Sequence, residues 1–234
     1  MLRKIDKKSM GVSNLGWLES RFHFSFAEYR DPQRMNFGVL RVLNDDIIHP
    51  QGGFGMHPHH DMEIVSYVVD GEITHKDSLG NSETLQRYDV QFMTAGTGIV
   101  HSEYNMNSDQ ALRLLQLWIF PQKKKLPVNY GSHRYTKEQM YNQLLKIVSS
   151  VKGDSPVKIN QDVSIFVSEL EQGKSLVYEI QSDRQIYYVQ IEGVSKVNEL
   201  TLDHGDALEV VKEKLLKIYA QEHTHLLFVE MADE

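Results

Sequence analysis

The sequence contains no cysteine, and this absence limits both how the chain is stabilised and which reactions it can carry out. Without cysteine there are no disulfide bonds and no thiolate nucleophiles, and zinc sites that depend on sulfur ligands are excluded as well. A metal ion bound by this chain would therefore take its ligands from histidine, aspartate, glutamate or water.

Long apolar segments and an excess of positive charge are also missing. No stretch approaches the roughly 18 apolar residues that a membrane-spanning helix requires. The first residues, MLRKIDKKSM, are charged and no apolar run follows them, so they do not resemble a secretory signal. A formal net charge of −7 and a pI near 5.9 argue against a general nucleic-acid-binding surface. We therefore expect a soluble, cytoplasmic protein with no membrane partner and no direct binding of nucleic acid.

The 234 residues carry many short segments typical of β-strands. Hydrophobic residues make up 41% of the sequence, enough for the cores of two domains of about 100–130 residues. Turns such as Asp70-Gly71 and Glu192-Gly193 separate the segments and favour an all-β sandwich or barrel. We predict strands at Phe37–Leu43, Glu63–Val69, Leu112–Phe120, Val163–Leu170, Gln185–Ile191 and His225–Glu230.

One helix and a weak internal repeat complete the outline. Apolar residues recur at helical spacing over Thr136–Val148, and the alternative is a shorter helix followed by an extended segment at 145–149. Residues 63–71 resemble residues 185–193, which lie 122 positions later, and both segments end at an acidic residue followed by glycine. This similarity suggests two related halves.

Three of the eleven histidines are crowded into the segment MHPHHDME. His57 and His59 are two residues apart, so on a strand both rings point to the same face. Two imidazoles that converge on one point match the geometry that a divalent metal ion requires. His60 follows His59 directly and should face the other way, so we expect it beside the ligands or at the surface.

A second pair of candidate ligands lies about 42 residues downstream, where His101 and Glu103 are again two residues apart. The strands of a small barrel can return the chain to the same interior over this distance. Three imidazoles and one carboxylate suit Fe(II), Mn(II), Ni(II), Cu(II) or Zn(II) and leave positions open for water or substrate. Glu63 lies four residues after His59, on the same face of a regular strand, so spacing alone leaves it as an alternative to Glu103.

These residues resemble the cupin superfamily and, more narrowly, the pirin family. The general cupin pattern is a glycine followed by HxH and a glutamate, then a later PxG and a histidine. GGFGMHPHHDME fits the first part, and Thr94-Ala95-Gly96 stands where PxG would be, which is the form found in the pirin family. The match also includes GWLESRFHFSFAEYRDP, FGVLRVLNDD and DVQFMTAGTGIVHSEYN. The C-terminal half matches only at Gln161-Asp162 and His204-Gly205-Asp206.

The resemblance implies an all-β bicupin, in which two antiparallel barrels pack together and only a few short helices occur. The barrel of residues 1–132 would hold one metal ion, with Fe(II) favoured and Zn, Mn, Ni or Cu as alternatives. The family pattern selects Glu103 over Glu63 and leaves Glu63, like His60, beside the site. The ligands that it implies are His57, His59, His101 and Glu103.

For the barrel of residues 133–234, the resemblance implies no metal. A constant offset of 122 residues places a glutamine, a poor ligand, at one of the four corresponding positions. The residues at these positions are Glu179, Gln181, His223 and His225.

Bacterial members of the family resemble quercetin 2,3-dioxygenases, so the resemblance implies an enzyme that cleaves flavonols such as quercetin with O₂. The hydroxyl and carbonyl groups of the substrate would approach open metal positions, and Glu103 would accept the hydroxyl proton. The metal would stabilise the enolate, and addition of O₂ would open the ring and release CO. The alternative is an iron-dependent regulatory protein, in which Fe(II)/Fe(III) exchange alters the affinity for a protein partner.

Apolar residues near the predicted ligands are candidates for binding an aromatic substrate at the mouth of the first barrel. Phe54, Met56 and Phe92 are the three candidates, because pockets for flat aromatic molecules tend to be apolar. Trp118 and Tyr67 lie on strands dense in apolar residues, and we expect both in the core.

Overall fold

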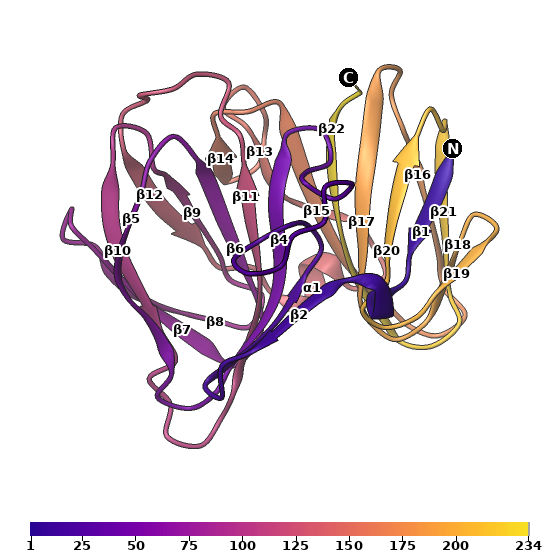
Figure 1. The fold of residues 1–234 in the computed structure, drawn as a ribbon. Coiled ribbons are helices and arrows are strands. Elements are labelled where there is room, and N and C mark those ends of the chain that lie inside the picture. Colours follow the sequence, from indigo (N-terminus) through magenta and orange to yellow (C-terminus); the bar gives the residue numbers. More distant parts are fainter. Residues whose placement is uncertain (234) are drawn as a thin grey trace. The chain divides into compact units, whose positions relative to one another are not determined.

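The computed structural model describes residues 1–233, which fold almost entirely into antiparallel β-structure (Figure 1). Contacts divide the chain into two compact units. The N-terminal unit comprises Gly11–Tyr135 and Val157–Gln161, and the C-terminal unit comprises Met1–Met10, Thr136–Pro156 and the chain from Asp162 onward. A single boundary between residues 132 and 133 does not capture this division, because each unit takes in a segment from the other half of the sequence.

The N-terminal unit consists of two antiparallel sheets, which form two facing layers (Figure 1). The larger sheet has the strand order β12-β9-β6-β11-β4-β3-β2, and the smaller has the order β5-β10-β7-β8. The strands are β2 (Gly11–Asn14), β3 (Leu18–Phe22), β4 (Leu40–Ile48), β5 (Gly53–His59), β6 (Glu63–Asp70), β7 (Glu72–Asp77), β8 (Ser82–Gln86), β9 (Val90–Thr94), β10 (Ile99–Tyr104), β11 (Leu112–Ile119) and β12 (Asn129–His133), with β14 (Val157–Ile159) added from later in the chain.

The C-terminal unit also has a larger and a smaller sheet, in which its own strands follow one another as β1-β20-β17-β22-β15-β13 and β16-β21-β18-β19. The first strand of the chain joins this unit because β1 pairs with β20, where Arg3 lies opposite Glu209 and forms an ion pair with it. The strands are β1 (Leu2–Ile5), β13 (Leu145–Ser150), β15 (Val163–Leu170), β16 (Ser175–Glu179), β17 (Arg184–Glu192), β18 (Ser195–Val197), β19 (Leu200–Leu202), β20 (Ala207–Val211), β21 (Leu215–Ala220) and β22 (Thr224–Ala232).

Apolar side chains hold the two sheets of each unit together. In the N-terminal unit, Val68 of β6 and Leu114 of β11 pack with Ile73 of the smaller sheet, and all three are buried. Burying one such side chain contributes about 1.5–3 kcal/mol, so these contacts fix one layer over the other. The C-terminal unit has an equivalent core, in which Tyr178 of the smaller sheet packs against Phe228 of the larger sheet with ring centroids 5.1 Å apart.

All six predicted strands are confirmed, as β4, β6, β11, β15, β17 and β22. Only the first is displaced, because it begins at Leu40 and continues to Ile48. The polar residues near its end suggest a turn in the sequence, but they lie in the sheet. Asp45 forms an ion pair with Arg113 of the neighbouring strand at 2.7 Å, and Asp46 is buried.

The predicted helix is much shorter than its periodicity indicates. Helix α1 comprises only Lys137–Met140, and Leu145–Ser150 forms β13, which confirms the extended alternative. The chain leaves the helical conformation at Tyr141, which is extended, and Asn142 follows with a φ of 56°. Ile147 and Val148, farther along, are buried on the strand that pairs with β15. Apart from α1, the described residues contain one 3₁₀ turn, Lys7–Ser9. No helix in the described part of the chain has the length and apolar character needed to cross a membrane.

The weak sequence repeat reflects a shared strand order, since β6 and β17 occupy corresponding places in the two larger sheets. Gly71 and Gly193 follow these strands with φ values of 74° and 73°. A Cβ atom at Gly71 would lie 2.5 Å from the carbonyl oxygen of Ala111, and one at Gly193 would lie 1.9 Å from that of His223. Both the dihedral angle and the close approach therefore require glycine.

Replacing Gly193 with alanine should destabilise the C-terminal unit by about 2 kcal/mol or more, because strain and a steric clash add together. Gly173→Ala is the matched control, because Gly173 has a φ of 84° but nothing within 4 Å of a Cβ atom. Urea unfolding should show a loss of about 1 kcal/mol for the control. Equal losses in both variants would show that the close approach to His223 does not matter.

Candidate metal centre

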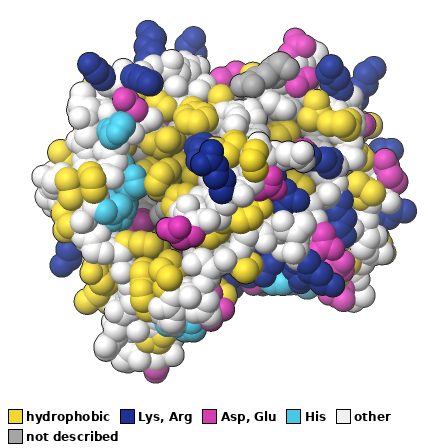
Figure 2. Space-filling model, viewed as in Figure 1, with side chains coloured by type: hydrophobic (Ala, Val, Ile, Leu, Met, Phe, Trp, Pro, Cys, Tyr) yellow, Lys and Arg dark blue, Asp and Glu magenta, His cyan; other side chains and the backbone are white. Residues whose placement is uncertain are grey.

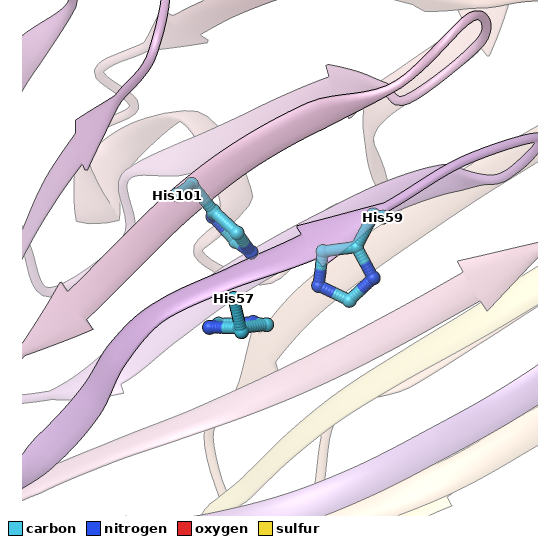
Figure 3. A group of neighbouring side chains, drawn as sticks. All are labelled: His57, His59 and His101. Carbon is cyan, nitrogen blue, oxygen red and sulfur yellow. The ribbon is translucent and has the colours of Figure 1, made fainter.

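Three of the predicted ligands converge from two neighbouring strands. Strand β5 carries His57 and His59, and β10 pairs with it antiparallel so that His101 lies directly opposite His57. The ring centroids are 4.8 Å apart for His57 and His59, 4.4 Å for His57 and His101, and 4.9 Å for His59 and His101. Figure 3 shows the three rings gathered at one place. One ring nitrogen from each forms a group in which no two atoms are more than 4.8 Å apart.

The two strands approach each other closely at the start of β5. A Cβ atom at Gly53 would lie 2.5 Å from the carbonyl oxygen of Glu103 and equally close to the ring of Tyr104. The pairing also shifts by one residue between His101 and Glu103, which is a β-bulge. A larger residue at Gly53 would push β5 away from β10 and separate the histidines.

Hydrogen bonding leaves nitrogen lone pairs available in this cluster. Nδ1 of His57 lies 2.7 Å from the carbonyl oxygen of Gly55, so Nδ1 carries the proton and Nε2 keeps its lone pair. Nε2 of His101 is buried and has no hydrogen-bond partner among the described residues. An unsatisfied buried nitrogen costs about 1–3 kcal/mol, and a bound metal ion would satisfy it.

Burial also keeps two of these histidines neutral. It lowers the pKa of His101 to about 3 and that of His59 to about 4, and the neighbouring His57 adds to both shifts. Neutral imidazole is the form that binds metals. At neutral pH the cluster therefore presents nitrogen donors of the kind that divalent transition metals prefer.

Glu103 lies beside the three rings but not among them. Its carboxylate accepts hydrogen bonds from the side-chain amides of Gln91 and Gln116, the second at 2.8 Å. A carboxylate oxygen of Glu103 forms a second candidate ligand group with ring nitrogens of His75 and His101. Burial raises the pKa of Glu103 to about 7, although the two amide hydrogen bonds act in the opposite direction.

The two glutamines that hold Glu103 were not predicted from the sequence. The indole N–H of Trp118 donates to Oε1 of Gln116 at 3.1 Å, which turns the amide nitrogen of Gln116 toward Glu103. Gln91 also donates to the hydroxyl of Ser66 at 3.3 Å. The only signal for them in the sequence was that each is a polar residue at an inward-facing position of an otherwise apolar strand.

His75 was missed as well. It lies on β7 opposite Glu103, is 1% exposed, and stacks on Tyr130 with ring centroids 4.3 Å apart. A signal for it was present in the segment ITHKD, because His75 and Asp77 repeat the spacing of the HxH pair. Burial opposes ionisation of Asp77, but hydrogen bonds from Asn81 and His75 hold its pKa below the usual range.

His60 and Glu63 both lie outside the candidate ligand groups. The side chain of His60 is 82% exposed and lies beside Asp61. Glu63 is buried on the larger sheet, where its carboxylate accepts hydrogen bonds from the hydroxyl of Thr94 at 2.9 Å and from the amide of Asn160 at 3.3 Å. Within residues 1–233, neither belongs to a candidate ligand group.

The three predicted substrate contacts have different surroundings. The ring of Phe54 lies 6.2 Å from that of His57, and Met56 is 59% exposed on the same strand. Phe92 follows Gln91 on β9, and Gln91 points to the interior. Because side chains alternate along a strand, Phe92 projects from the opposite face of the sheet and does not line this site.

Trp118, expected in the core, instead borders the histidine cluster. Its indole packs edge-on against His59 with ring centroids 4.8 Å apart, and against Phe26 at 5.4 Å. The same indole lines a surface pocket of about 480 Å³. Figure 2 shows histidine and hydrophobic side chains together at the surface on the flank where Figure 1 places β5 and β10. Tyr67, by contrast, is fully buried as predicted.

The C-terminal unit repeats the strand order but not the ligands. Four side chains pack into its apolar core at the positions that correspond to the predicted ligands by strand register and by inward orientation. They are Leu176, Tyr178, Ile218 and Ala220. None of them offers an imidazole or a carboxylate. The constant offset therefore pointed to residues that do not correspond to the ligands.

The N-terminal unit thus combines two packed sheets with histidines that converge from neighbouring strands, as in metal-binding cupins. Residues 5–119 match the family model described as Pirin, and residues 146–231 match the one described as Quercetinase C-terminal cupin domain. The chain belongs to the pirin family.

Individual relatives cover nearly the whole chain. A putative quercetin 2,3-dioxygenase of Zymomonas mobilis is 40% identical over 98% of this chain and 97% of its own length. The quercetin 2,3-dioxygenase of Escherichia coli is 37% identical over 98% of this chain and 97% of its own. The crystal structure of the bacterial pirin YhhW from Escherichia coli, in complex with nickel(II), superposes with a TM-score of 0.94. It is 34% identical, and the match covers all of both chains.

Proposed function

We propose that this protein is a metal-dependent dioxygenase that cleaves flavonols such as quercetin with O₂. The observation that carries the proposal is the convergence of His57, His59 and His101, with one buried nitrogen that has no hydrogen-bond partner among the described residues. Three nitrogen ligands leave coordination positions for a substrate and for O₂. The names of the relatives and the nickel(II) complex of one of them support the same assignment.

In this proposal, His57, His59, His101 and Glu103 hold one Fe(II) ion. When bound, the metal supplies Lewis-acid stabilisation of the substrate enolate and a binding position for O₂. Glu103 can serve as the fourth ligand from its place beside His101. Each of its carboxylate oxygens accepts an amide N–H and still has a lone pair to offer.

Glu103 is also the proposed general base. In the metal-free protein, burial raises the pKa of Glu103 to about 7, so the site favours the protonated carboxyl. In this proposal Glu103 accepts the proton of the flavonol hydroxyl and releases it again. Gln91 and Gln116 hold the carboxylate in place during this transfer. Both atoms of one O₂ enter the ring-opened ester, and the carbon that carried the hydroxyl leaves as CO, so the reaction consumes no external reductant.

The aromatic rings of the substrate would lie against apolar side chains at the open side of the cluster. Phe54 lies beside His57, and Trp118 connects His59 with the pocket of about 480 Å³. The exposed Met56, on the same strand, remains a candidate for contact with the substrate. Small-molecule sites commonly have volumes of about 300–1,000 Å³, so this pocket is large enough for part or all of a flavonol.

Protein loaded with Fe(II) and incubated with quercetin in air should remove the flavonol absorbance, consume O₂ and release CO. His57→Ala should lower turnover by about a hundredfold or more, because it removes a metal ligand. His60→Ala is the matched control and should keep wild-type turnover, because the side chain of His60 is exposed.

Equal inactivity of the wild type and both variants with Fe(II), Mn(II), Ni(II), Cu(II) and Zn(II) would show that the dioxygenase assignment is wrong for flavonols. The regulatory alternative predicts instead that the affinity for a protein partner differs between the Fe(II) and Fe(III) forms.

A further inference from the structure

A chain of buried polar side chains leads from the hairpin between β7 and β8 to His101. Oδ2 of Asp77 lies 3.2 Å from Nε2 of His75, and Nδ1 of His75 lies 3.5 Å from Nδ1 of His101. The side chains of Asp77 and His75 are 0% and 1% exposed, and His101 is 2% exposed. Bulk water therefore does not compete for these hydrogen bonds.

The hydrogen bonds around Asp77 determine which atom is the donor in each hydrogen bond between Asp77, His75 and His101. Oδ1 of Asp77 accepts the backbone N–H groups of Leu79 at 2.9 Å and Asn81 at 3.0 Å, and Oδ2 accepts the side-chain amide of Asn81 at 2.8 Å. A carboxylate surrounded by donors can only accept, so His75 must donate to it from Nε2. The neutral ring of His75 then has its lone pair at Nδ1, and His101 must donate to that lone pair from its own Nδ1.

This order of donors leaves the lone pair of His101 on Nε2, which is the buried atom without a hydrogen-bond partner among the described residues. We propose that Asp77 and His75 are positioning residues, which fix the tautomer of His101 and so direct its Nε2 lone pair at the metal. Ligating histidines commonly donate their second N–H to a carboxylate, and here one imidazole is interposed. The inference rests on the proposed metal site but not on the proposed reaction.

His75 is a positioning residue and not a ligand, although it belongs to a candidate ligand group. Both of its nitrogens are engaged, one with Asp77 and the other with His101. Stacking on Tyr130, with an angle of 11° between the rings, also fixes the plane of the imidazole. His75 would have to give up these contacts to bind a metal.

The C-terminal unit lacks the same arrangement in its described residues. Ser195 on β18 occupies the position of His75, because it lies opposite Ala220 as His75 lies opposite Glu103. The hairpin between β18 and β19 is shorter than the one between β7 and β8, which supplies the donors to Asp77. The long hairpin and the histidine cluster thus occur together in one unit.

Asp77→Asn tests the inference, because an amide can donate to His75 as well as accept from it. The Ni(II) affinity of the metal-free protein, measured by competition with a chromophoric chelator, should fall by about 10–100-fold. His75→Phe should cause a similar loss while keeping the ring that stacks on Tyr130 and the hairpin around Asp77. Lys76→Ala is the matched control and should bind Ni(II) like the wild type, because Lys76 lies between the two residues but is exposed.

A second measurement reads the tautomer directly and does not depend on metal or activity. Long-range ¹H–¹⁵N spectra of the metal-free wild type should show His101 protonated on Nδ1, and Asp77→Asn should shift it toward protonation on Nε2. Protonation of His101 on Nε2 in the wild type would overturn the inference. So would Ni(II) affinities within about twofold of the wild type in both folded variants. Failure to cleave quercetin would reject the proposed function and leave these results unchanged.

Discussion

Replacing His101 with phenylalanine is expected to abolish tight metal binding while the fold stays intact. His101 belongs to both candidate ligand groups, so its loss leaves neither group complete. Phenylalanine fills a similar volume and removes the buried Nε2 atom, whose unsatisfied state costs about 1–3 kcal/mol. The substitution also leaves Nδ1 of His75 without its donor, so the two effects roughly offset and the metal-free variant should be about as stable as the metal-free wild type.

Elemental analysis of protein purified without a chelating tag, together with thermal unfolding with and without added metal, measures this effect. Free metal at a hundredfold excess over Kd should stabilise the wild type by about 2.7 kcal/mol and should leave His101→Phe unchanged. His60→Ala should behave like the wild type, because its side chain is 82% exposed. If His101→Phe contained as much metal as the wild type, the metal would bind at a site other than the histidine cluster. A wild type that contains no metal and gains no stability from any divalent ion would refute the site itself.

The spacing of the histidines was informative because it depends only on strand geometry. His57 and His59 share one face of any regular strand, whichever strand pairs with it. That His101 lies opposite His57 depends on the register between β5 and β10, and nothing local in the sequence determines that register. The cluster could therefore be predicted as a set of residues, whereas its geometry could not.

The choice between two glutamates shows where spacing fails. Placing Glu63 on the same face as His59 assumes one regular strand, but β5 ends at His59 and Asp61 has a φ of 50°. The break turns Glu63 into the larger sheet, where Thr94 donates to its carboxylate. A single residue with positive φ is difficult to predict, because aspartate adopts that conformation only occasionally.

A constant offset between the halves failed for a related reason. The similarity between β6 and β17 was visible in the sequence, because the two strands occupy corresponding places in the larger sheets. The smaller sheets differ in the length of one hairpin, because Lys76 pairs with Ser82 in one unit and Val197 pairs with Leu200 in the other. Every position after that hairpin is shifted, so His101 and Glu103 were matched to the wrong part of the C-terminal unit. The offset already fails before the hairpin, because His57 and His59 correspond to Leu176 and Tyr178.

The second large effect is expected from Glu103→Gln, which should stabilise the metal-free protein at high pH but not at low pH. Burial raises the pKa of Glu103 from 4.5 to about 7, so the folded state favours the protonated form. Below pH 4.5 the carboxyl is protonated in both the folded and unfolded states, and glutamine resembles the protonated acid. As the pH rises from 4.5 to 7, the wild type loses stability on the order of 3 kcal/mol, and the variant does not. The difference should then stay constant above pH 7.

Urea unfolding of both proteins between pH 4.5 and pH 8, with a chelator present, measures this difference. His59 and His101 occur in both proteins, so their contributions cancel to first order. Asp46 should increase the effect, because burial and the charge of Glu103 both contribute to raising its pKa to about 7. Removing that charge lets Asp46 ionise at less cost.

Glu171→Gln provides a control of opposite sign. A hydrogen bond from Asn142 holds the pKa of Glu171 below its usual value, so this carboxylate stabilises the fold above pH 4.5 and the stabilisation is lost as the pH falls. With unfolding followed to below pH 4.5, the Glu171→Gln variant should therefore become relatively less stable as the pH rises toward 4.5 and change no further above it, whereas Glu103→Gln becomes more stable between pH 4.5 and pH 7. A difference between Glu103→Gln and the wild type that does not change with pH would mean that Glu103 is ionised throughout. The hydrogen bonds from Gln91 and Gln116 would then lower the pKa of Glu103 by at least as much as burial raises it. A proton-accepting role of Glu103 near neutral pH would have to be given up.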